Sequence, residues 1–96
     1  MSFYFHPLAN SELAEAVQHY EECQIGLGLD FAEEVYAAIE RISKYPDAWF
    51  ELSRNTRRCL LNRFPYGVIF QFKSGTIYII AIAHLHRRPG YWKDRA

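Results

Sequence analysis

The chain has 96 residues, half of them hydrophobic, and its eleven basic side chains balance eleven acidic ones. This length predicts a single domain over residues 1–96, and the apolar content excludes an intrinsically disordered chain. The longest apolar run, residues 77–83, is too short to cross a bilayer, and residues 1–8 lack the features of a secretion signal. We therefore expect a cytoplasmic protein that does not enter a membrane.

The neutral total hides an uneven distribution of charge along the chain. Residues 1–48 carry nine acidic and two basic side chains, a net charge of −7, and residues 49–96 carry the reverse, a net charge of +7. Such asymmetry indicates a basic surface that meets an anionic partner. The alternative is that the two halves neutralise each other where the fold brings them together.

The first predicted elements are a short strand and an amphipathic helix. Residues 2–5, SFYF, are strand-like, and the proline of the following His-Pro pair ends the strand because it cannot donate to a ladder. A helix then continues to about residue 24. Its apolar stripe consists of Leu13, Ala16, Val17, Tyr20 and Cys23. Glutamates, Glu12 among them, cover the opposite side, which we expect to face solvent.

A second helix is predicted after the glycines of the sequence GLGLD. Gly26 can end the first helix in the left-handed conformation. Asp30 then caps the second helix, and Glu33 stands where a capping box places its acidic residue. Pro46 ends this helix. So short a turn between two helices predicts an antiparallel helical hairpin.

Three strands are predicted after a polar loop at residues 46–56. They cover residues 57–64, 68–72 and 76–84, with turns between them. The last strand is apolar on both faces, and strict alternation assigns Ile77, Ile79 and Ala81 to one face and Ile80 and Ile82 to the other. We therefore expect this strand to be central in the sheet.

This order of elements, β-α-α-β-β-β, predicts an α+β fold. The helical hairpin is expected to pack on one face of a mostly antiparallel sheet. The other face, near Arg57, Arg63 and the C-terminal segment, is then available to a partner.

The sequence lacks the common motifs of catalysis and metal binding. It contains no phosphate-binding glycine loop with its lysine, and no GxSxG motif. Cys23 and Cys59 each lie in an apolar pattern without CxxC spacing, so we expect two buried free thiols. His84 and His86 point to the same side of a strand end, but no third ligand accompanies them. We expect no metal and no cofactor, whereas a backbone partner and an acid–base or binding role for these histidines both stay open.

The segment HLHRRPGYWKD, residues 84–94, gathers cationic and aromatic side chains directly after the apolar strand. Arg87 and Arg88 can bind phosphate or carboxylate, and Tyr91 and Trp92 offer flat faces to a base or to another side chain. These residue types suit an RNA-cutting site, and they also dominate protein-interface hot spots. A third possibility is that Tyr91 and Trp92 fold back over the sheet edge and leave the arginines in solvent.

Several blocks of the sequence, taken together and in order, resemble the RelE/ParE superfamily of type II toxin–antitoxin toxins, which includes ParE-like plasmid stabilisation proteins. The blocks are the HP pair after the first strand, AVQHYEE, GLGLDFAEEVYAAIERISKYPDAW, RRCLLNRFPYGVIFQF and IAHLHRRPGYW. The resemblance covers nearly the whole chain, and the last two blocks are the most specific. It implies a helical hairpin on an antiparallel sheet, in agreement with the order of elements above.

The family has two main branches, which differ in activity. RelE-like members cut mRNA on the ribosome without a metal, and ParE-like members inhibit DNA gyrase. Arg87 and Tyr91 match positions that look like the catalytic arginine and tyrosine of the first branch. However, Gly67 stands where that branch has a further arginine, and glycine offers no charge to a transition state. The neutral composition, with a pI near 6.9, also differs from that of a strongly basic ribosome-binding enzyme.

The resemblance therefore implies a ParE-like toxin that inhibits DNA gyrase by binding and is neutralised by a cognate antitoxin. The residues expected to form its binding surface are Arg57, Arg63, Arg87, Arg88, Tyr91 and Trp92. One alternative is a RelE-like endoribonuclease acting on mRNA at the ribosome. The residues that would serve it are Arg63, Arg87, Tyr91, His84 and His86. A third is a non-toxic member of the family that only binds an antitoxin.

Overall fold

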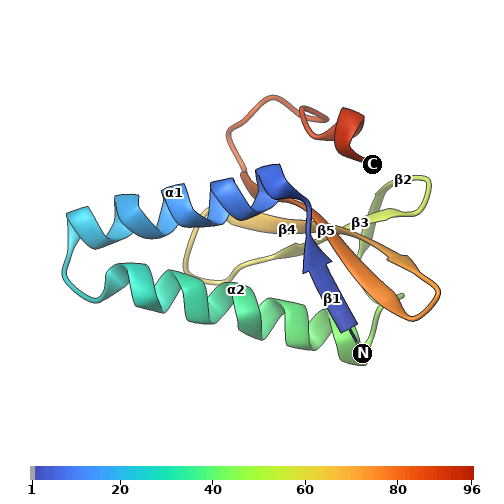
Figure 1. Cartoon of the computed structure of the whole chain (residues 1–96), viewed down its shortest axis with the longest axis horizontal. Helices are drawn as coiled ribbons and strands as arrows, with labels where there is room; N and C mark the ends of the chain where they lie inside the picture. The colour runs from blue at the N-terminus through green and yellow to red at the C-terminus, as the bar shows by residue number, and fades with distance from the viewer. Residues whose placement is uncertain (1) are drawn as a thin grey trace.

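The computed structural model describes residues 2–96, which form a layer of two antiparallel helices on one face of a five-stranded sheet (Figure 1). The helices are α1 (Pro7–Cys23), α2 (Leu27–Lys44) and the 3-10 turn η1 (Lys93–Arg95). The strands are β1 (Ser2–Phe5), β2 (Phe50–Ser53), β3 (Thr56–Leu60), β4 (Tyr66–Lys73) and β5 (Thr76–His84). They lie in the order β1-β5-β4-β3-β2, with β1 parallel to β5 and all other neighbours antiparallel. The predicted α+β fold is confirmed.

The loop expected at residues 46–56 contains an additional strand, β2, at the edge of the sheet. It pairs with β3, so that Phe50 lies opposite Arg58 and Glu51 lies opposite Arg57. Its residues, FELS, alternate between apolar and polar types, but one such stretch of four residues inside a polar loop is a weak signal, and the strand is not among those predicted.

The strand expected at residues 57–64 ends at residue 60, and the chain then turns toward α2. The carboxylate of Glu34 on α2 accepts hydrogen bonds from the backbone N–H groups of Asn62 and Arg63. These two bonds satisfy backbone donors that would otherwise pair with a neighbouring strand. The turn is therefore fixed to the helix layer.

Helix α2 begins at Leu27, so the prediction that Asp30 caps it is wrong. The preceding residue, Gly26, has a φ of 90°, and the carboxylate of Glu21 on α1 accepts hydrogen bonds from the backbone N–H groups of Gly26 and Gly28 at 3.1 Å. The acceptor that a capping side chain normally supplies thus comes from the preceding helix. Asp30 lies within the first turn instead.

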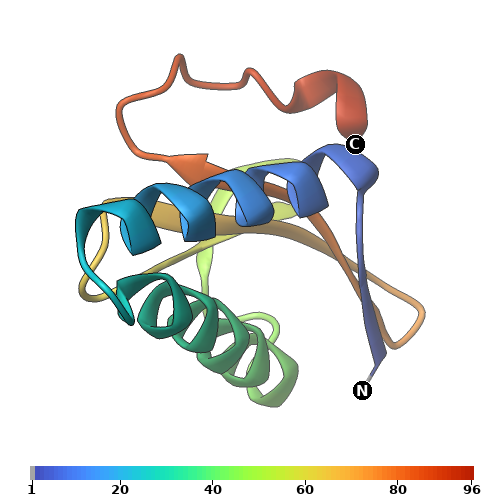
Figure 2. The same cartoon turned by 60° about the vertical axis from the view of Figure 1, so that its left-hand side comes forward.

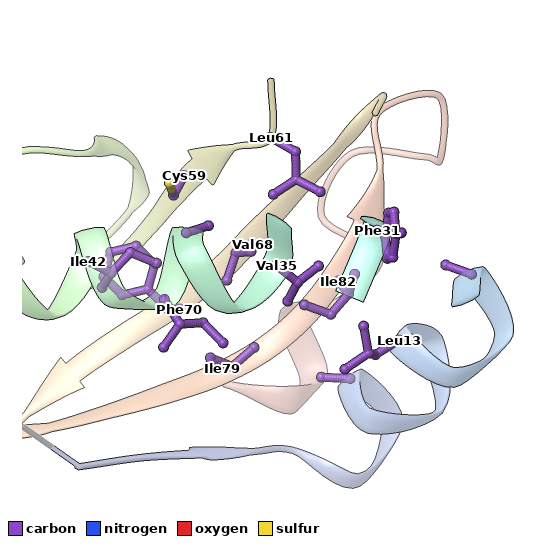
Figure 3. Packing of buried hydrophobic residues seen from close by; sticks show 14 of the residues in the cluster. Leu13, Phe31, Val35, Ile42, Cys59, Leu61, Val68, Phe70, Ile79 and Ile82 are labelled. Carbon is purple, nitrogen blue, oxygen red and sulfur yellow. The ribbon is translucent and has the colours of Figure 1, made fainter. Parts of the chain in front are cut away.

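The core lies between the helices and the sheet (Figure 3). Its fully buried side chains include Phe31, Val35, Ile42, Val68, Phe70 and Ile79. Cys59 is buried in this core, but Cys23 is exposed, so the expectation of a buried thiol is wrong there. Cys23 is the last residue of α1, and this end of the helix lies away from the centre of the sheet (Figure 1).

Strand β5 lies between β1 and β4, as its apolar pattern predicts, but a β-bulge changes which residues share a face. Ile79 and Ala81 lie opposite consecutive residues of β4, which leaves Ile80 as an extra residue. The extra residue shifts the alternation of side chains. As a result Ile79 and Ile82 both belong to the core under the helices, whereas Ile80 and Ala81 belong to a second cluster. The predicted assignment of faces is therefore correct through Ile80 and wrong for Ala81 and Ile82.

The C-terminal residues return across the molecule to the start of α1. Both views place the C-terminus beside the first turns of that helix (Figures 1 and 2). Neither of the two long helices within residues 2–96 is apolar enough over its length to cross a membrane.

Candidate functional site

The C-terminal tail, residues 85–96, folds back over the face of the sheet that the helices leave open. Trp92 is only 6% exposed and packs with Ile69, Ile80 and Ala83 in the second apolar cluster. Ile69 lies on the side of β4 opposite to its neighbours in the core under the helices, which identifies the face. Trp92 therefore folds back over the sheet, which is one part of the third possibility considered for the tail.

One carboxylate, that of Glu12 on α1, holds the tail in place. It accepts hydrogen bonds from the phenol of Tyr91 at 2.8 Å and from the guanidinium of Arg95 at 2.9 and 3.0 Å. It also accepts a hydrogen bond from the backbone N–H of Ile82 at 3.0 Å. The side chains of Glu12 and Arg95 are only 12% and 11% exposed, so the expectation that Glu12 faces solvent is wrong.

Two guanidinium groups contact the ring of Tyr91. The central carbon of Arg87 lies 3.8 Å from the ring centroid and that of Arg95 lies 5.1 Å away, both within the range of cation–π attraction. Burial, followed by the hydrogen bond to Glu12, raises the pKa of Tyr91 well above its ordinary value of 10.0, and the two arginines lower it by less. At neutral pH the Tyr91 phenol is therefore a hydrogen-bond donor.

The tail and the open face of the sheet enclose a pocket of about 310 Å³, which we call the tail pocket. Its cationic lining residues are Arg58, Arg87, Arg88 and Lys93. Apolar side chains, among them those of Ile69 and Trp92, form its floor, and no Asp or Glu lines it. A pocket of this composition can bind an anionic group attached to an apolar body.

Arg58 reaches the tail pocket by crossing Gly67 on the neighbouring strand. A Cβ atom at Gly67 would lie 3.0 Å from both Cγ and Cδ of Arg58, so the glycine leaves room for the arginine stem. The guanidinium of Arg58 lies 5.7 Å from the ring centroid of Phe50. Gly67 has no charged side chain, but the side chain of Arg58 on the adjacent strand β3 lies over it and brings a cation to this position.

The structure brings together only part of the surface expected from the sequence. Arg87, Arg88, Tyr91 and Trp92 all line the tail pocket. Arg57 does not, because its guanidinium donates a hydrogen bond to the backbone carbonyl of Trp49 at 2.8 Å and lies 4.0 Å from Glu51.

Arg63 also lies away from the tail pocket, in the turn between β3 and β4. Its guanidinium is 3.5 Å from the carboxylate of Asp30 on α2 and 5.4 Å from the ring of Phe64. The turn is held on the helix side of the molecule, so Arg63 and the tail arginines do not converge.

His84 and His86 lie side by side at the end of β5, with ring centroids 5.0 Å apart. The Nδ1 atom of His84 accepts a hydrogen bond from the backbone N–H of His86 at 3.0 Å, which is the backbone partner considered above. His84 lines the tail pocket. Within residues 2–96 no group of three His, Cys, Asp or Glu side chains is placed to hold a metal ion.

Three residues of this site, Glu12, Arg58 and Arg95, are not identified by sequence reasoning. Glu12 borders the apolar stripe of α1 and looks like any other solvated glutamate until the tail is placed against it. Arg58 becomes recognisable only once the strand register is known, since β3 and β4 together place its side chain over Gly67. No local sequence motif indicates the role of Glu12 or of Arg58.

No protein-family model and no curated protein matches the chain. Among solved structures, it is similar to a chain of the structure titled "Chromosomal ParDE TA system from P. aeruginosa". The two chains are 20% identical with a TM-score of 0.73, over 90% of this chain and 97% of that chain. The fold implied by the resemblance to the RelE/ParE superfamily is therefore confirmed.

Proposed function

We propose that this chain is a ParE-like toxin of a type II toxin–antitoxin pair, which inhibits DNA gyrase by binding it and is neutralised by a cognate antitoxin. The observation that carries the proposal is the shared fold over 90% of the chain with a protein of a ParDE system. The sequence blocks at the turn before β4 and in the tail support the same branch of the superfamily.

The geometry around Tyr91 opposes the use of Tyr91 and Arg87 as the catalytic pair of a ribonuclease. A metal-independent ribonuclease needs a group that can accept the proton of the attacking 2′-hydroxyl. Tyr91 is instead a donor to Glu12, and burial with that bond raises its pKa. Arg87, which would stabilise a phosphorane, lies 3.6 Å from the same carboxylate. Both groups thus have structural partners that oppose a catalytic role.

An antitoxin partner is supported by apolar side chains that the fold leaves in solvent along the helical hairpin. Ile25, Leu29 and Tyr36 are 91%, 64% and 48% exposed. An amphipathic antitoxin segment that folds on binding would cover such side chains. Copurification with the coexpressed protein of a neighbouring reading frame tests this part of the proposal. If the two proteins form no complex, this part of the proposal is wrong.

Gyrase inhibition is tested with the purified chain in a DNA supercoiling assay. We expect the chain to inhibit supercoiling, and we expect Arg88→Gln, which removes an exposed cation of the tail, to need at least about tenfold more protein, a loss of about 1.4 kcal/mol. The matched control is Arg54→Gln, an equally simple loss of one exposed cation in the turn between β2 and β3. Normal supercoiling at every concentration of the unmodified chain would contradict the proposal.

A further inference from the structure

Arg58 carries a hydrogen-bond donor that the chain itself does not satisfy. Its Nε atom is buried, and residues 2–96 supply it with no acceptor. A buried donor without a partner costs about 1–3 kcal/mol, and native proteins contain few of them. The Arg58 side chain lines the tail pocket, so an anion bound there meets its guanidinium, and a small shift of the side chain that opens Nε to this anion would remove the cost.

The positive charge of the tail pocket is also uncompensated. Within the described part of the chain, no ion pair involves Arg58, Arg88 or Lys93. The tail arginines that do pair with a carboxylate are Arg87 and Arg95, and both contact Glu12. Three cations around an apolar floor, with no acid in the lining, favour a ligand that carries negative charge.

The aromatic side chains of the tail favour a peptide over a nucleic acid as this ligand. Binding of single strands relies on aromatic faces on which bases stack. Trp92 is buried against the sheet, and the ring of Tyr91 is already contacted by Arg87 and Arg95. The pocket retains apolar surface at Leu52 and Ile69, which suits aliphatic side chains.

We infer that the tail pocket is a binding site for an acidic peptide segment of a protein partner, with a Glu or Asp carboxylate bonded to Arg58 and flanking apolar side chains on the floor. Gly67 is the specificity-determining neighbour, because it gives Arg58 its path into the pocket. The inference rests on the proposed function only in taking the partner to be a protein.

The test follows the Arg58 Nε–H resonance of the ¹⁵N-labelled full chain by NMR. The probe is the capped pentapeptide acetyl-Ala-Leu-Glu-Leu-Ala-amide, and its counterpart with Gln in place of Glu is the control. We expect the Glu peptide to shift the Arg58 Nε–H and Trp92 indole signals and to bind at least about tenfold more tightly than the Gln peptide, because a charge-assisted bond contributes more than a neutral one.

Two variants separate a direct role of Arg58 from a general effect of charge. Arg58→Lys keeps the cation but lacks Nε, and Gly67→Ala requires the arginine stem to shift by a few tenths of an ångström, because the new Cβ would lie 3.0 Å from its Cγ and Cδ atoms. Both are expected to lose the preference for Glu over Gln while the backbone amide spectrum stays that of a folded chain, and Arg54→Lys is expected to retain it. Equal binding of the two peptides, no shift at Arg58, or tighter binding of hexathymidylate at the same signals would overturn the inference. Because peptide binding is measured on the isolated chain, its failure is distinct from a failure to inhibit gyrase.

Discussion

Glu12 connects three segments that are far apart in the chain. Strand β1 ends at Phe5. The backbone N–H of the next residue, His6, still donates a hydrogen bond to the carbonyl of Ile79 on β5 at 2.8 Å. Beyond that point Glu12 accepts the N–H of Ile82, and Arg95 donates to the carbonyl of Ile80 at 3.1 Å. The side chains of Glu12 and Arg95 thus bond backbone groups of β5 that β1 is too short to reach, and this holds the tail at the edge of β5.

Replacing Glu12 by Gln is expected to lower the free energy of unfolding by about 2–3 kcal/mol, because it leaves a mostly buried Arg95 without its counter-charge. Urea denaturation of the two chains measures the difference. The control is Glu15→Gln on the same helix, where the side chain is exposed and a change within about 0.5 kcal/mol is expected. Equal stability of the Glu12 variant and the unmodified chain would mean that the tail is not held by this pair.

Tyr91 gives stability a dependence on alkaline pH. Its pKa is raised in the folded chain, so the unfolded chain loses the phenolic proton first as pH increases. The corresponding stability is therefore fully present below the ordinary value of 10.0 and decreases as pH rises above it. Tyr20 and Tyr66, whose pKa values are also raised by burial, act in the same direction.

The contribution of Tyr91 is isolated by comparing the unmodified chain with Tyr91→Phe. We expect the loss of stability between pH 9 and pH 11, which brackets the ordinary tyrosine pKa of about 10, to be smaller in the Phe variant. Urea midpoints across this range provide the measurement. An identical alkaline decrease in both chains would show that the Tyr91 phenol titrates normally.

At the scale of elements, the hairpin of α1 and α2 depends on a close approach of the two helices at Gly28. A Cβ atom there would lie 2.6 Å from the carbonyl oxygen of Val17 and 3.1 Å from Cβ of Glu21. Glu21 also supplies the hydrogen bonds that begin α2. The position therefore combines helix packing with helix capping.

Gly28→Ala is expected to destabilise the chain by about 1–3 kcal/mol through overpacking, although alanine is the better helix former. Thermal unfolding measures the change. Gly26→Ala serves as the comparison, since its Cβ would meet no atom within 4 Å and its cost comes only from the φ of +90°. A more stable Gly28→Ala variant would show that the helices can separate without loss.

Elements that bury a clear apolar pattern could be predicted from the sequence. The α2 stripe and the 76–84 strand are examples, since many apolar residues report the same period. The start of α2 and the bulge at Ile80 could not be predicted. Each depends on a tertiary partner, Glu21 in the first case and the pairing with β4 in the second, and a local pattern contains no information about either.

The candidate site shows the same division. The cationic and aromatic residues of the tail are evident from their local density, and Arg87, Arg88, Tyr91 and Trp92 do lie together. Arg58 and Glu12 come from other elements and are brought to the tail only by the fold. Arg57 and Arg63 do not line the tail pocket, because Arg57 contacts Trp49 and Arg63 contacts Asp30. Grouping basic residues by type alone therefore assigns too many residues to the site.

At the scale of the whole molecule, the opposed charges of the two halves are partly neutralised and partly left free. Glu12 meets Arg87 and Arg95, and Asp30 meets Arg63. The tail pocket keeps cations that no acid of the described chain pairs with. Neutralisation of one half by the other therefore holds for these contacts, and the tail pocket is the surface that stays available to an anionic partner.

The most direct test of the proposed function is induced expression in a bacterial host, with chromosomal DNA damage and mRNA integrity measured in the same cells. The account predicts growth arrest with broken DNA and intact mRNA, as expected when gyrase is inhibited. Growth arrest with mRNA cut at ribosome-occupied codons would contradict it and would make Arg87 and Tyr91 part of an active site.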